Sequence, residues 1–484
     1  MGFGFRPSDL LRPSAFGFRL FALAALLSLC GCKVGPNYVA PKPEAPASWV
    51  GATNAQGGRT AVSTKPAEDL LRWWEKFNDP KLTRLVAQAL RTNLDVKMAE
   101  ARLRQARAQR GVVAGGLWPS LTASGSFTRE RFGSDRASPS GYFGYFLAGL
   151  DALWEVDIFG GTRRNVESAS ANIVAAQEDL HDAQVTLAAE VALDYVQLRG
   201  FQQQIVVAQN NLKAQQHTAE ITRQKFGVGF VSALDVANAD AQVATTESAV
   251  PVLQTSAQQT IYALSILLAR PPGELLQELA DPQPLPVTPP EVPVGLPSDL
   301  LRRRPDVRAA EARLHAATAQ IGVAVADFFP QFSLSGSLNY QNNLIEKLFT
   351  GASSFASFGP SVTWPIFQGG SIAANVRVQK ALRDQSYITY QQTVLGALQD
   401  VENALIALSK EWEHRKFLNQ SVVANRKAVE LSTLLYSEGQ TDFLNVLVAQ
   451  LSLYSAENAL IQSTENTVTD VIALYKALGG GWEN

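Results

Sequence analysis

One pattern of residues occurs twice in this chain, and the repetition limits what the chain can fold into. The stretch KFGVGFVSALDVANA, residues 225–239, returns as LYSEGQTDFLNVLVA, residues 435–449, so that Gly229 corresponds to Gly439. In the same way NLDVKMAEARLRQA returns as RPDVRAAEARLHAA, LWPSL as FFPQF, and DIFGG as PIFQGG. Self-similarity of this extent predicts two copies of one structural unit of about 210 residues.

Each copy contains a very long helical pattern without an internal proline, from Thr162 to Phe226 in the first copy and from Ser371 to Tyr436 in the second. At 1.5 Å per residue, about 65 residues make a rod of roughly 98 Å. No globular core requires a helix of this length. Shorter helical patterns follow each rod, from Ser232 to Ala269 and from Asp442 to Leu478.

The stretch that first revealed the repeat lies where each rod reverses direction. Gly229 and Gly439 can adopt the positive φ that a tight turn requires. Ser232 or Asp442 can then cap the helix that follows. The sequence therefore predicts two antiparallel helical hairpins with one such turn each.

The second returning helix has a 3–4 spacing that is typical of a coiled-coil seam. The seam positions are Leu444, Leu447, Leu451, Tyr454, Asn458, Ile461, Glu465, Val468, Ile472 and Tyr475. Asn458 and Glu465 are polar positions within this seam.

Alternating sequence follows the proline-containing break in each copy. In LTASGSFT and in FSLSGSLNYQ, apolar residues alternate with serine, threonine or asparagine, and a period of two predicts strands. We expect their partners at Tyr142 to Trp154 and at Phe355 to Phe367. The two β-hairpins would then span about 120–158 and about 331–367.

The four strands also bear on how the chain meets a membrane. No segment after the export signal approaches the ~18 apolar residues of a membrane helix, so a crossing must use strands. Four strands cannot close a barrel alone, and unpaired edges are costly in lipid, so copies must share one barrel. Three copies would supply twelve strands, with long helices forming a cylinder beneath them.

The first residues indicate export. Three arginines precede LFALAALLSLCGC, an apolar run that is too short for a membrane helix and is typical of a secretory signal. The two cysteines of the chain, Cys30 and Cys32, lie at the end of this signal and so cannot form a disulfide in the fold downstream.

Cys32 is the predicted site of a covalent lipid. Gly31 before it and Leu29 three positions before it resemble the bacterial lipobox, whereas Cys30 follows the bulky Leu29 and fits less well. Lys33 follows Cys32, and it is an Asp at that position that tends to retain such lipoproteins at the inner membrane. We therefore expect a lipid-anchored protein of the outer membrane. An ordinary signal peptide with two incidental cysteines is the alternative.

Composition and motifs argue against an enzyme or a nucleic-acid partner. The formal net charge is -2 and the four histidines are scattered without companions at metal-ligand spacing. We therefore expect no catalytic residue, no metal and no cofactor apart from the lipid. The RRRPD stretch before Pro305 is interpreted as a solvated helix start, and LGGGW as a helix cap and tail.

These patterns divide the chain into six parts. They are a signal peptide (1–31), a lipidated extended segment (32–66), a first repeat (67–270, with its helical hairpin at about 162–270), a proline-rich linker in an equatorial region (271–297), a second repeat (298–478, with its helical hairpin at about 371–478) and a C-terminal tail (479–484). The nine prolines of the linker are expected to forbid a helix and to favour an extended strap.

Five stretches resemble one known family over nearly the whole mature chain. They are CKVGPNYVAP, GLPSDLLRRRPDVRAAEARL, DFFPQFSLSGS, YSEGQTDFLNVLVAQ and LYKALGGGW. The family is that of the TolC-like outer-membrane efflux channels, and the subgroup is the NodT-type lipoproteins. The resemblance implies a mixed α+β, mostly α fold, in which a homotrimer builds a twelve-stranded outer-membrane β-barrel continued by a long periplasmic α-helical barrel.

The resemblance also implies partners and a gate. The partners are outer-membrane lipid, a periplasmic adaptor (membrane fusion) protein and an inner-membrane efflux transporter, most often of the proton-driven RND type. Carried over by position, Leu444 stands in the constriction at the helical turns, with Asp235, Asp240 and Asp442 as acidic residues nearby. Val448 stands where the family often has Asp. Asp235 and Asp442 are alternatively plain helix caps.

The function implied is a passive conduit that exports small molecules, drugs or metal ions. Two alternatives stay open. One is a channel for type I protein secretion beside an ATP-driven transporter. The other is a periplasmic coiled-coil scaffold that never spans the membrane, although such a scaffold leaves the four alternating segments without a purpose.

Overall fold

The computed structural model describes residues 33–42, 46–51, 61–63, 70–132, 141–289 and 291–482. The predicted signal peptide, Cys32 and the last two residues of the tail lie outside the described residues. The chain forms two compact units. The first comprises Met1–Pro41, Arg104–Ala175 and Ala310–Tyr390, and the second comprises Lys42–Leu103, Ala176–Ala309 and Gln391–Asn484.

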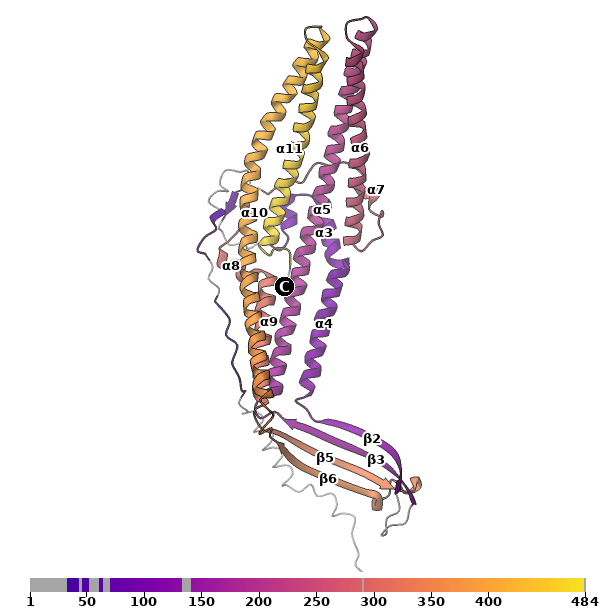
Figure 1. The fold of residues 1–484 in the computed structure, drawn as a ribbon, viewed down its shortest axis with the longest axis vertical. Helices are drawn as coiled ribbons and strands as arrows, with labels where there is room; N and C mark the ends of the chain where they lie inside the picture. The colour runs from indigo at the N-terminus through magenta and orange to yellow at the C-terminus, as the bar shows by residue number, and fades with distance from the viewer. Residues whose placement is uncertain are drawn as a thin grey trace, which may run out of the picture. The chain divides into compact units, whose positions relative to one another are not determined.

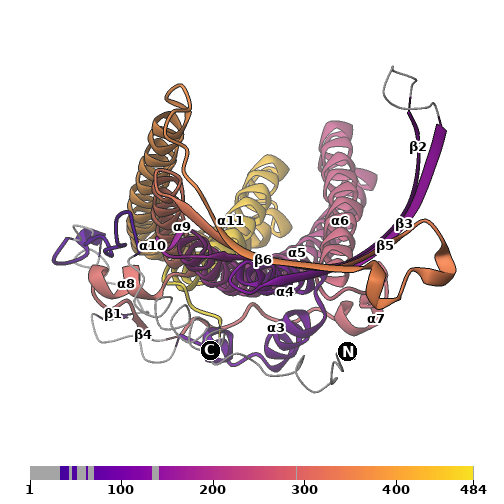
Figure 2. The same ribbon diagram turned by 90° about the horizontal axis from the view of Figure 1, so that it is seen from below.

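The first unit contains one antiparallel sheet of four strands in the order β2-β3-β5-β6. The strands are β2 (Ser120–Phe132), β3 (Gly141–Val156), β5 (Gln331–Asn342) and β6 (Ser354–Thr363). Both predicted β-hairpins are confirmed, and the central pair joins the two repeats, with Leu150 opposite Leu338. Figures 1 and 2 show that the four strands follow one common curve.

The last strand is shorter than the sequence pattern predicts. We expected it to continue to Phe367, but β6 ends at Thr363. Pro365 has no N–H to donate and so cannot extend a ladder. Pro360 is tolerated inside β6 because this strand lies at an edge of the sheet.

Long helices account for most of the chain, as predicted. Those with residues in both units are α4 (Leu94–Gly115), α5 (Gly161–Gly227), α9 (Pro305–Ala326) and α10 (Ser371–Ser437). The returning helices are α6 (Ala233–Leu267) and α11 (Phe443–Ala477). Helices α5 and α10 each have 67 residues, and their ends agree with the proline-free runs within one residue. No helix in the described part of the chain is long and apolar enough to cross a bilayer.

The second unit also contains short elements and an aromatic core. The short elements are β1 (Ala61–Ser63), η3 (Trp73–Phe77), α3 (Pro80–Thr92), α7 (Leu276–Leu279), β4 (Glu291–Pro293) and α8 (Pro297–Arg303), while η4 (Ile345–Lys347) and η5 (Gly351–Ser353) belong to the first unit. Trp73 is fully buried and stacks on Tyr475 with ring centroids 5.3 Å apart.

The linker between the repeats differs from the expected extended strap. It contains the short helix α7, which lies in a stretch free of prolines, so the prediction that no helix forms here was wrong. Farther along, Val292 of β4 pairs in parallel with Val62 of β1. Extended backbone is therefore present only in part of the linker.

The RRRPD stretch starts a helix at Pro305 as we expected, and Arg302 is exposed, but the prediction of a solvated stretch was wrong for Arg304. Arg304 has a side chain only 13% exposed. Its guanidinium lies 2.6 Å from Asp306 and 3.0 Å from Asp400, and it donates to the carbonyl of Ala477 at the end of α11. An arginine with three such acceptors can be buried. Arg304 thus ties the start of one helix to the end of another.

Candidate functional site at the helical turns

The first turn joins α5 to α6 and is built on glycine. Gly229 has φ +80, and a Cβ added there would meet nothing within 4 Å, so backbone conformation alone demands the glycine. The amide of Phe230 donates to the carbonyl of Lys225 and the amide of Gly229 to that of Phe226, both at 2.9 Å. This pair of bonds is the Schellman pattern that ends a helix.

The second turn, between α10 and α11, has the same geometry. Gly439 has φ +75 and equally open surroundings. The amide of Gln440 donates to the carbonyl of Leu435 at 2.8 Å, and the amide of Gly439 donates to that of Tyr436 at 3.1 Å. The conformation expected for both glycines is therefore present.

The two caps differ, although the sequence predicted either residue as a cap. Ser232 and Asp235 form a complete capping box: the Asp235 carboxylate accepts from the Ser232 amide at 2.9 Å, and the Ser232 hydroxyl accepts from the Asp235 amide. Asp442 occupies the cap position of α11, but its side chain makes no cap hydrogen bond. The side-chain cap expected for Asp442 is therefore wrong, and its carboxylate is exposed to solvent.

Asp240 lies two turns inside α6 and is paired with a cation. Its carboxylate is 2.6 Å from the Arg223 guanidinium on α5, and both side chains are about half exposed. Arg223 also contacts Glu220 on its own helix. An exposed pair of this kind contributes little to stability but fixes where the charges lie.

The seam of α11 is displaced by one residue near the turn. Predicted seam positions there are exposed, Leu444 by 60% and Leu451 by 42%, whereas Phe443, Val446 and Gln450 are buried. The side chain of Leu444 is thus not used for packing within its own hairpin. The expectation of a strict seam from Leu444 onward was wrong for this end of the helix.

The other end of the same helix follows the predicted seam. Glu465, Val468, Ile472 and Tyr475 are all buried. Glu465 lies directly against Gly200 of α5, where an added Cβ would collide with the carboxylate. Burial raises the pKa of Glu465 to about 7, because the charged form loses its hydration.

The two hairpins meet near their turns in a small cluster that sequence reasoning missed. Tyr436, Phe443 and Val446 of the second hairpin pack with Ala219 and Ala239 of the first, and all five are buried. Aromatic residues beside each glycine were visible in the sequence. Their contact was not, because it crosses from one repeat to the other.

Polar bonds fix the register of this cluster. The Tyr436 hydroxyl donates to Thr222 Oγ1 at 3.0 Å, and both side chains are buried. One helical turn away, Gln450 donates to Thr218 Oγ1, also at 3.0 Å. The Lys225 ammonium lies 4.4 Å from the centroid of the Tyr436 ring and donates to the Tyr436 carbonyl.

The exposed residues of the two turns differ in character. Around the first turn, large apolar side chains face solvent: Phe226 by 47%, Val228 by 69% and Phe230 by 82%. The second turn has Glu438 and Gln440 at the corresponding positions, both exposed. One turn is therefore apolar and aromatic, and the other is polar.

Within the described residues, no group of three or more His, Cys, Asp or Glu side chains is placed to hold a metal ion. The turns carry conformational and packing features and no nucleophile with a base beside it. What this arrangement can do is hold two helical hairpins together, or let them separate, at their turns.

Comparison with known proteins places this architecture. The family described as "Outer membrane efflux protein" matches residues 85–270 and 296–480. Nodulation protein T of Rhizobium leguminosarum bv. trifolii is 34% identical over 94% of this chain and 96% of its own. The pyoverdine export outer membrane protein OpmQ of Pseudomonas aeruginosa is 30% identical over 96% and 97%. The solved outer-membrane channel OprN superposes with a TM-score of 0.85 at 38% identity, over 93% of this chain and 100% of that one.

The fold and its turns therefore define a channel component of the bacterial outer membrane. The chain belongs to the outer membrane efflux protein family. It is the outer-membrane channel component of a tripartite efflux system, extends into the periplasm and is not an enzyme. The family resemblance drawn from the five sequence stretches is confirmed.

Proposed function

We propose that this protein is a passive conduit whose two helical turns form both its gate and its docking surface. In this proposal three copies assemble as a homotrimer, a periplasmic adaptor protein holds the turns, and a proton-driven inner-membrane transporter of the RND type supplies the cargo. A lipid on Cys32 adds a second attachment to the outer membrane. The observation that carries the proposal is that one set of residues at the turns is buried between the hairpins, whereas Leu444 and Phe230 beside it are exposed.

The strand edges support assembly from several copies. Among the described residues, β2 pairs only with β3 and β6 only with β5, so each outer strand has one edge without a ladder partner. Edges of 13 and 10 residues are long, and unpaired backbone groups are costly in a membrane. Pairing of β2 in one copy with β6 in the next satisfies both edges.

Exposed apolar side chains on the same strands support contact with outer-membrane lipid. Phe127, Tyr142, Phe358 and Val362 lie on one face of the sheet, and each is more than half exposed in the single chain. Large apolar groups gathered on a surface indicate a contact with another molecule or with lipid.

The exposure of the Leu444 side chain supports its role in a gate. Because Phe443 and Val446 already fill the contact between the hairpins, Leu444 is free to face a neighbouring copy or the passage. Asp442 beside it is exposed, so an acidic group accompanies the apolar one. Asp235 and Asp240 are engaged with Ser232 and Arg223, and we assign them a supporting electrostatic role.

The docking surface is supported by the apolar first turn. Exposed phenylalanine and valine at Phe226, Val228 and Phe230 gain from burial against an apolar partner surface. A protein adaptor supplies such a surface, whereas solvent or a transported solute does not. The polar second turn is the better candidate for lining the opening.

The test is restoration of drug efflux in a bacterium that lacks its own channel of this class, with the cognate adaptor and transporter supplied. Wild type should restore resistance, and Phe230→Ser should abolish both resistance and adaptor co-purification while leaving the channel in the membrane. Val252→Ser, at an exposed position on α6 away from the turn, is the matched control. A Phe230→Ser protein that still binds the adaptor as wild type would overturn the docking role. Mass spectrometry of the N-terminal peptide should show acylated Cys32.

A further inference from the structure

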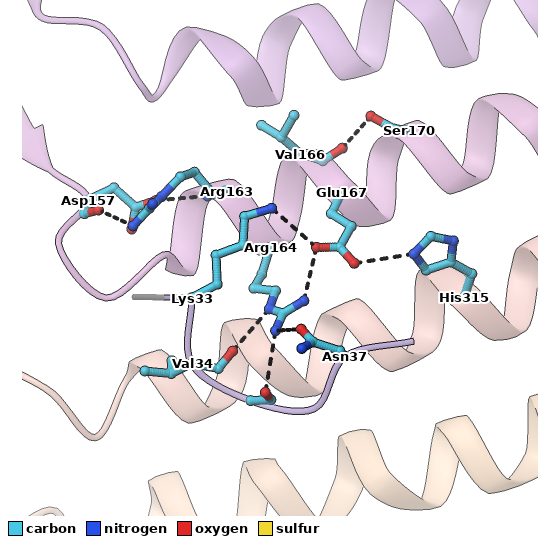
Figure 3. Close-up of polar contacts among 11 residues, drawn as sticks. Lys33, Val34, Asn37, Asp157, Arg163, Arg164, Val166, Glu167, Ser170 and His315 are labelled. Atoms are coloured by element: carbon cyan, nitrogen blue, oxygen red, sulfur yellow. Dashed lines mark hydrogen bonds and ion pairs between the residues drawn. The ribbon is translucent and has the colours of Figure 1, made fainter. Parts of the chain in front are cut away.

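Apart from Cys32, the stretch CKVGPNYVAP has no role in the function proposed so far. Its described part, residues 33–41, contains no helix or strand. Figure 3 shows residues 33–37 lying against the first turn of α5 and beside α9, within the first unit. The Val34 amide donates to the carbonyl of Phe159 at 3.1 Å, immediately before the glycines of the DIFGG stretch.

Arg164 is the centre of this contact. Its side chain is only 2% exposed. The guanidinium donates to the Val34 carbonyl at 3.0 Å, the Gly35 carbonyl at 3.3 Å and Asn37 Oδ1 at 2.8 Å, and it also pairs with Glu167 at 3.0 Å. Of these four hydrogen bonds, three go to residues 34–37. The buried cation therefore depends on the N-terminal segment for most of its acceptors.

Glycines let the segment approach this closely. Gly35 has φ +85, and a Cβ there would lie 2.5 Å from the Gly322 Cα on α9. A Cβ on Gly322 would in turn lie 2.7 Å from Cγ of Arg164. At Gly160, an added Cβ would lie 2.9 Å from the Lys33 Cα. Three glycines from separate parts of the chain thus line one binding surface for residues 33–38, which we call the seat.

Glu167 and the ring of Tyr38 complete the seat. Glu167 pairs with Lys33 at 3.6 Å and accepts from His315 Nε2 at 3.2 Å. Burial opposes its charge, but the bonds from His315 and Arg164 outweigh burial, so the pKa of Glu167 lies below its ordinary value. Tyr38 stacks on His315 with ring centroids 4.3 Å apart and donates to Glu311 at 3.0 Å.

The second repeat has no such seat. The counterpart of DIFGG is PIFQGG, and a Cβ added at Gly369 or Gly370 would meet nothing within 4 Å. Three residues beyond the second glycine stands Arg164 in the first repeat and Ala373 in the second. A feature present in only one copy of a duplicated unit is not required by the helical hairpin itself. It points to a role specific to the first repeat.

We propose that Arg164, Glu167 and Gly322 form a binding seat for residues 33–38 and that Arg164 is the positioning residue that holds Lys33 at the junction of β3 and α5. The lipid attached to Cys32, which rests on the proposed function, then enters the membrane beside the junction of β3 and α5. Residues 33–38 are thus bound to the rest of the folded chain and do not act as a flexible tether. Removing it leaves a buried guanidinium short of acceptors, so release is costly.

The experiment is hydrogen exchange read by mass spectrometry on the full-length protein in detergent, at the amides of Val34, Gly35, Asn37 and Tyr38. In wild type the Val34 amide should exchange slowly, as a native hydrogen-bonded amide does. Arg164→Ala should speed its exchange by at least about tenfold, the loss expected from charge-assisted bonds. Arg110→Ala is the matched control, because Arg110 contacts α5 at Ser170 and not the segment.

Two further variants separate release from misfolding. Asn37→Ala removes an acceptor from the segment and leaves α5 intact, and Gly322→Ala displaces the Arg164 side chain, whereas Gly111→Ala has open space around it. Both should speed exchange at Val34 while amides of β3 and β5 stay protected, and trypsin should then cut after Lys33. Fast exchange at Val34 in wild type, or wild-type exchange in both Arg164→Ala and Asn37→Ala, would overturn the seat. An unmodified residue 32 with a protected Val34 would remove the lipid and leave the seat standing.

Discussion

The hydroxyl of Tyr436 on α10 donates a buried hydrogen bond to Thr222 on α5, so the two helical hairpins of one chain are joined beside their turns by a polar contact. Its neighbours in the cluster are Ala219, Phe443 and Val446. Replacing Tyr436 by Phe removes this hydrogen bond but keeps the aromatic ring that packs in the cluster. That property makes it a probe of whether the hairpins separate.

Tyr436→Phe should favour the separated state of the turns. Loss of one buried hydrogen bond costs about 1 kcal/mol, which shifts a two-state equilibrium about fivefold. In planar bilayers we therefore expect higher mean conductance from the variant. Tyr454→Phe is the control, because it removes the same hydroxyl group from a half-buried tyrosine of α11. Equal conductance in wild type and Tyr436→Phe would show that this bond does not hold the passage closed.

Leu444→Ala should raise single-channel conductance and admit large antibiotics, because an exposed apolar side chain is removed from the proposed constriction. Leu234→Ala is a strict control, since Leu234 is the repeat counterpart and is 68% exposed against 60% for Leu444. Neither change opens a cavity in the hairpin core. If the Leu234 variant conducts more and the Leu444 variant does not, the gate belongs to the first turn.

Asp235→Asn and Asp235→Ala should separate charge from capping. The amide oxygen of Asn can still accept from the Ser232 amide, so Asn should keep most of the cap, whereas Ala should cost about 1 kcal/mol of stability. If the Asp235 charge also favours cations, both variants should lower cation selectivity to the same degree. Selectivity unchanged in both would leave Asp235 as a helix cap only. Thermal unfolding and reversal potentials measure the two effects.

Glu465→Gln should stabilise the protein at high pH and have little effect at low pH. The pKa of Glu465 is about 7 in the fold, above its ordinary value of 4.5, so the folded state holds a proton that the unfolded state releases between these values. Stability therefore falls as pH rises through this window, by about 3 kcal/mol in total. Thermal unfolding at pH 5 and pH 8 should show a difference for wild type that Gln removes. If the stability of wild type and of Glu465→Gln changes equally between pH 5 and pH 8, Glu465 is ionised in the folded protein.

Much of the fold was predictable because it rests on local rules. Proline-free runs fixed the ends of α5 and α10 within one residue, and alternation located the four strands. The strand order β3 beside β5 follows from no local rule, since it pairs one repeat with the other.

The errors share a physical cause. Near the turn, α11 has two overlapping 3–4 patterns, one through Leu444 and one through Phe443 and Val446, and hydrophobicity does not say which is buried within the chain. Arg304 looked like a surface cation because its acceptors Asp400 and Ala477 lie far away in sequence. Polar contacts between segments far apart in sequence leave no periodic signal.

Equal helix lengths in the two repeats have a consequence for how such a chain can change over time. Helices α5 and α10 have 67 residues each, and α6 and α11 have 35 each. An insertion in α5 alone would carry Thr222 away from Tyr436, and even seven added residues would rotate the contact by about 20°. The two repeats can therefore differ in amino-acid composition, but a change in the length of α5 must be matched by the same change in α10 if the contact between Thr222 and Tyr436 is to be kept.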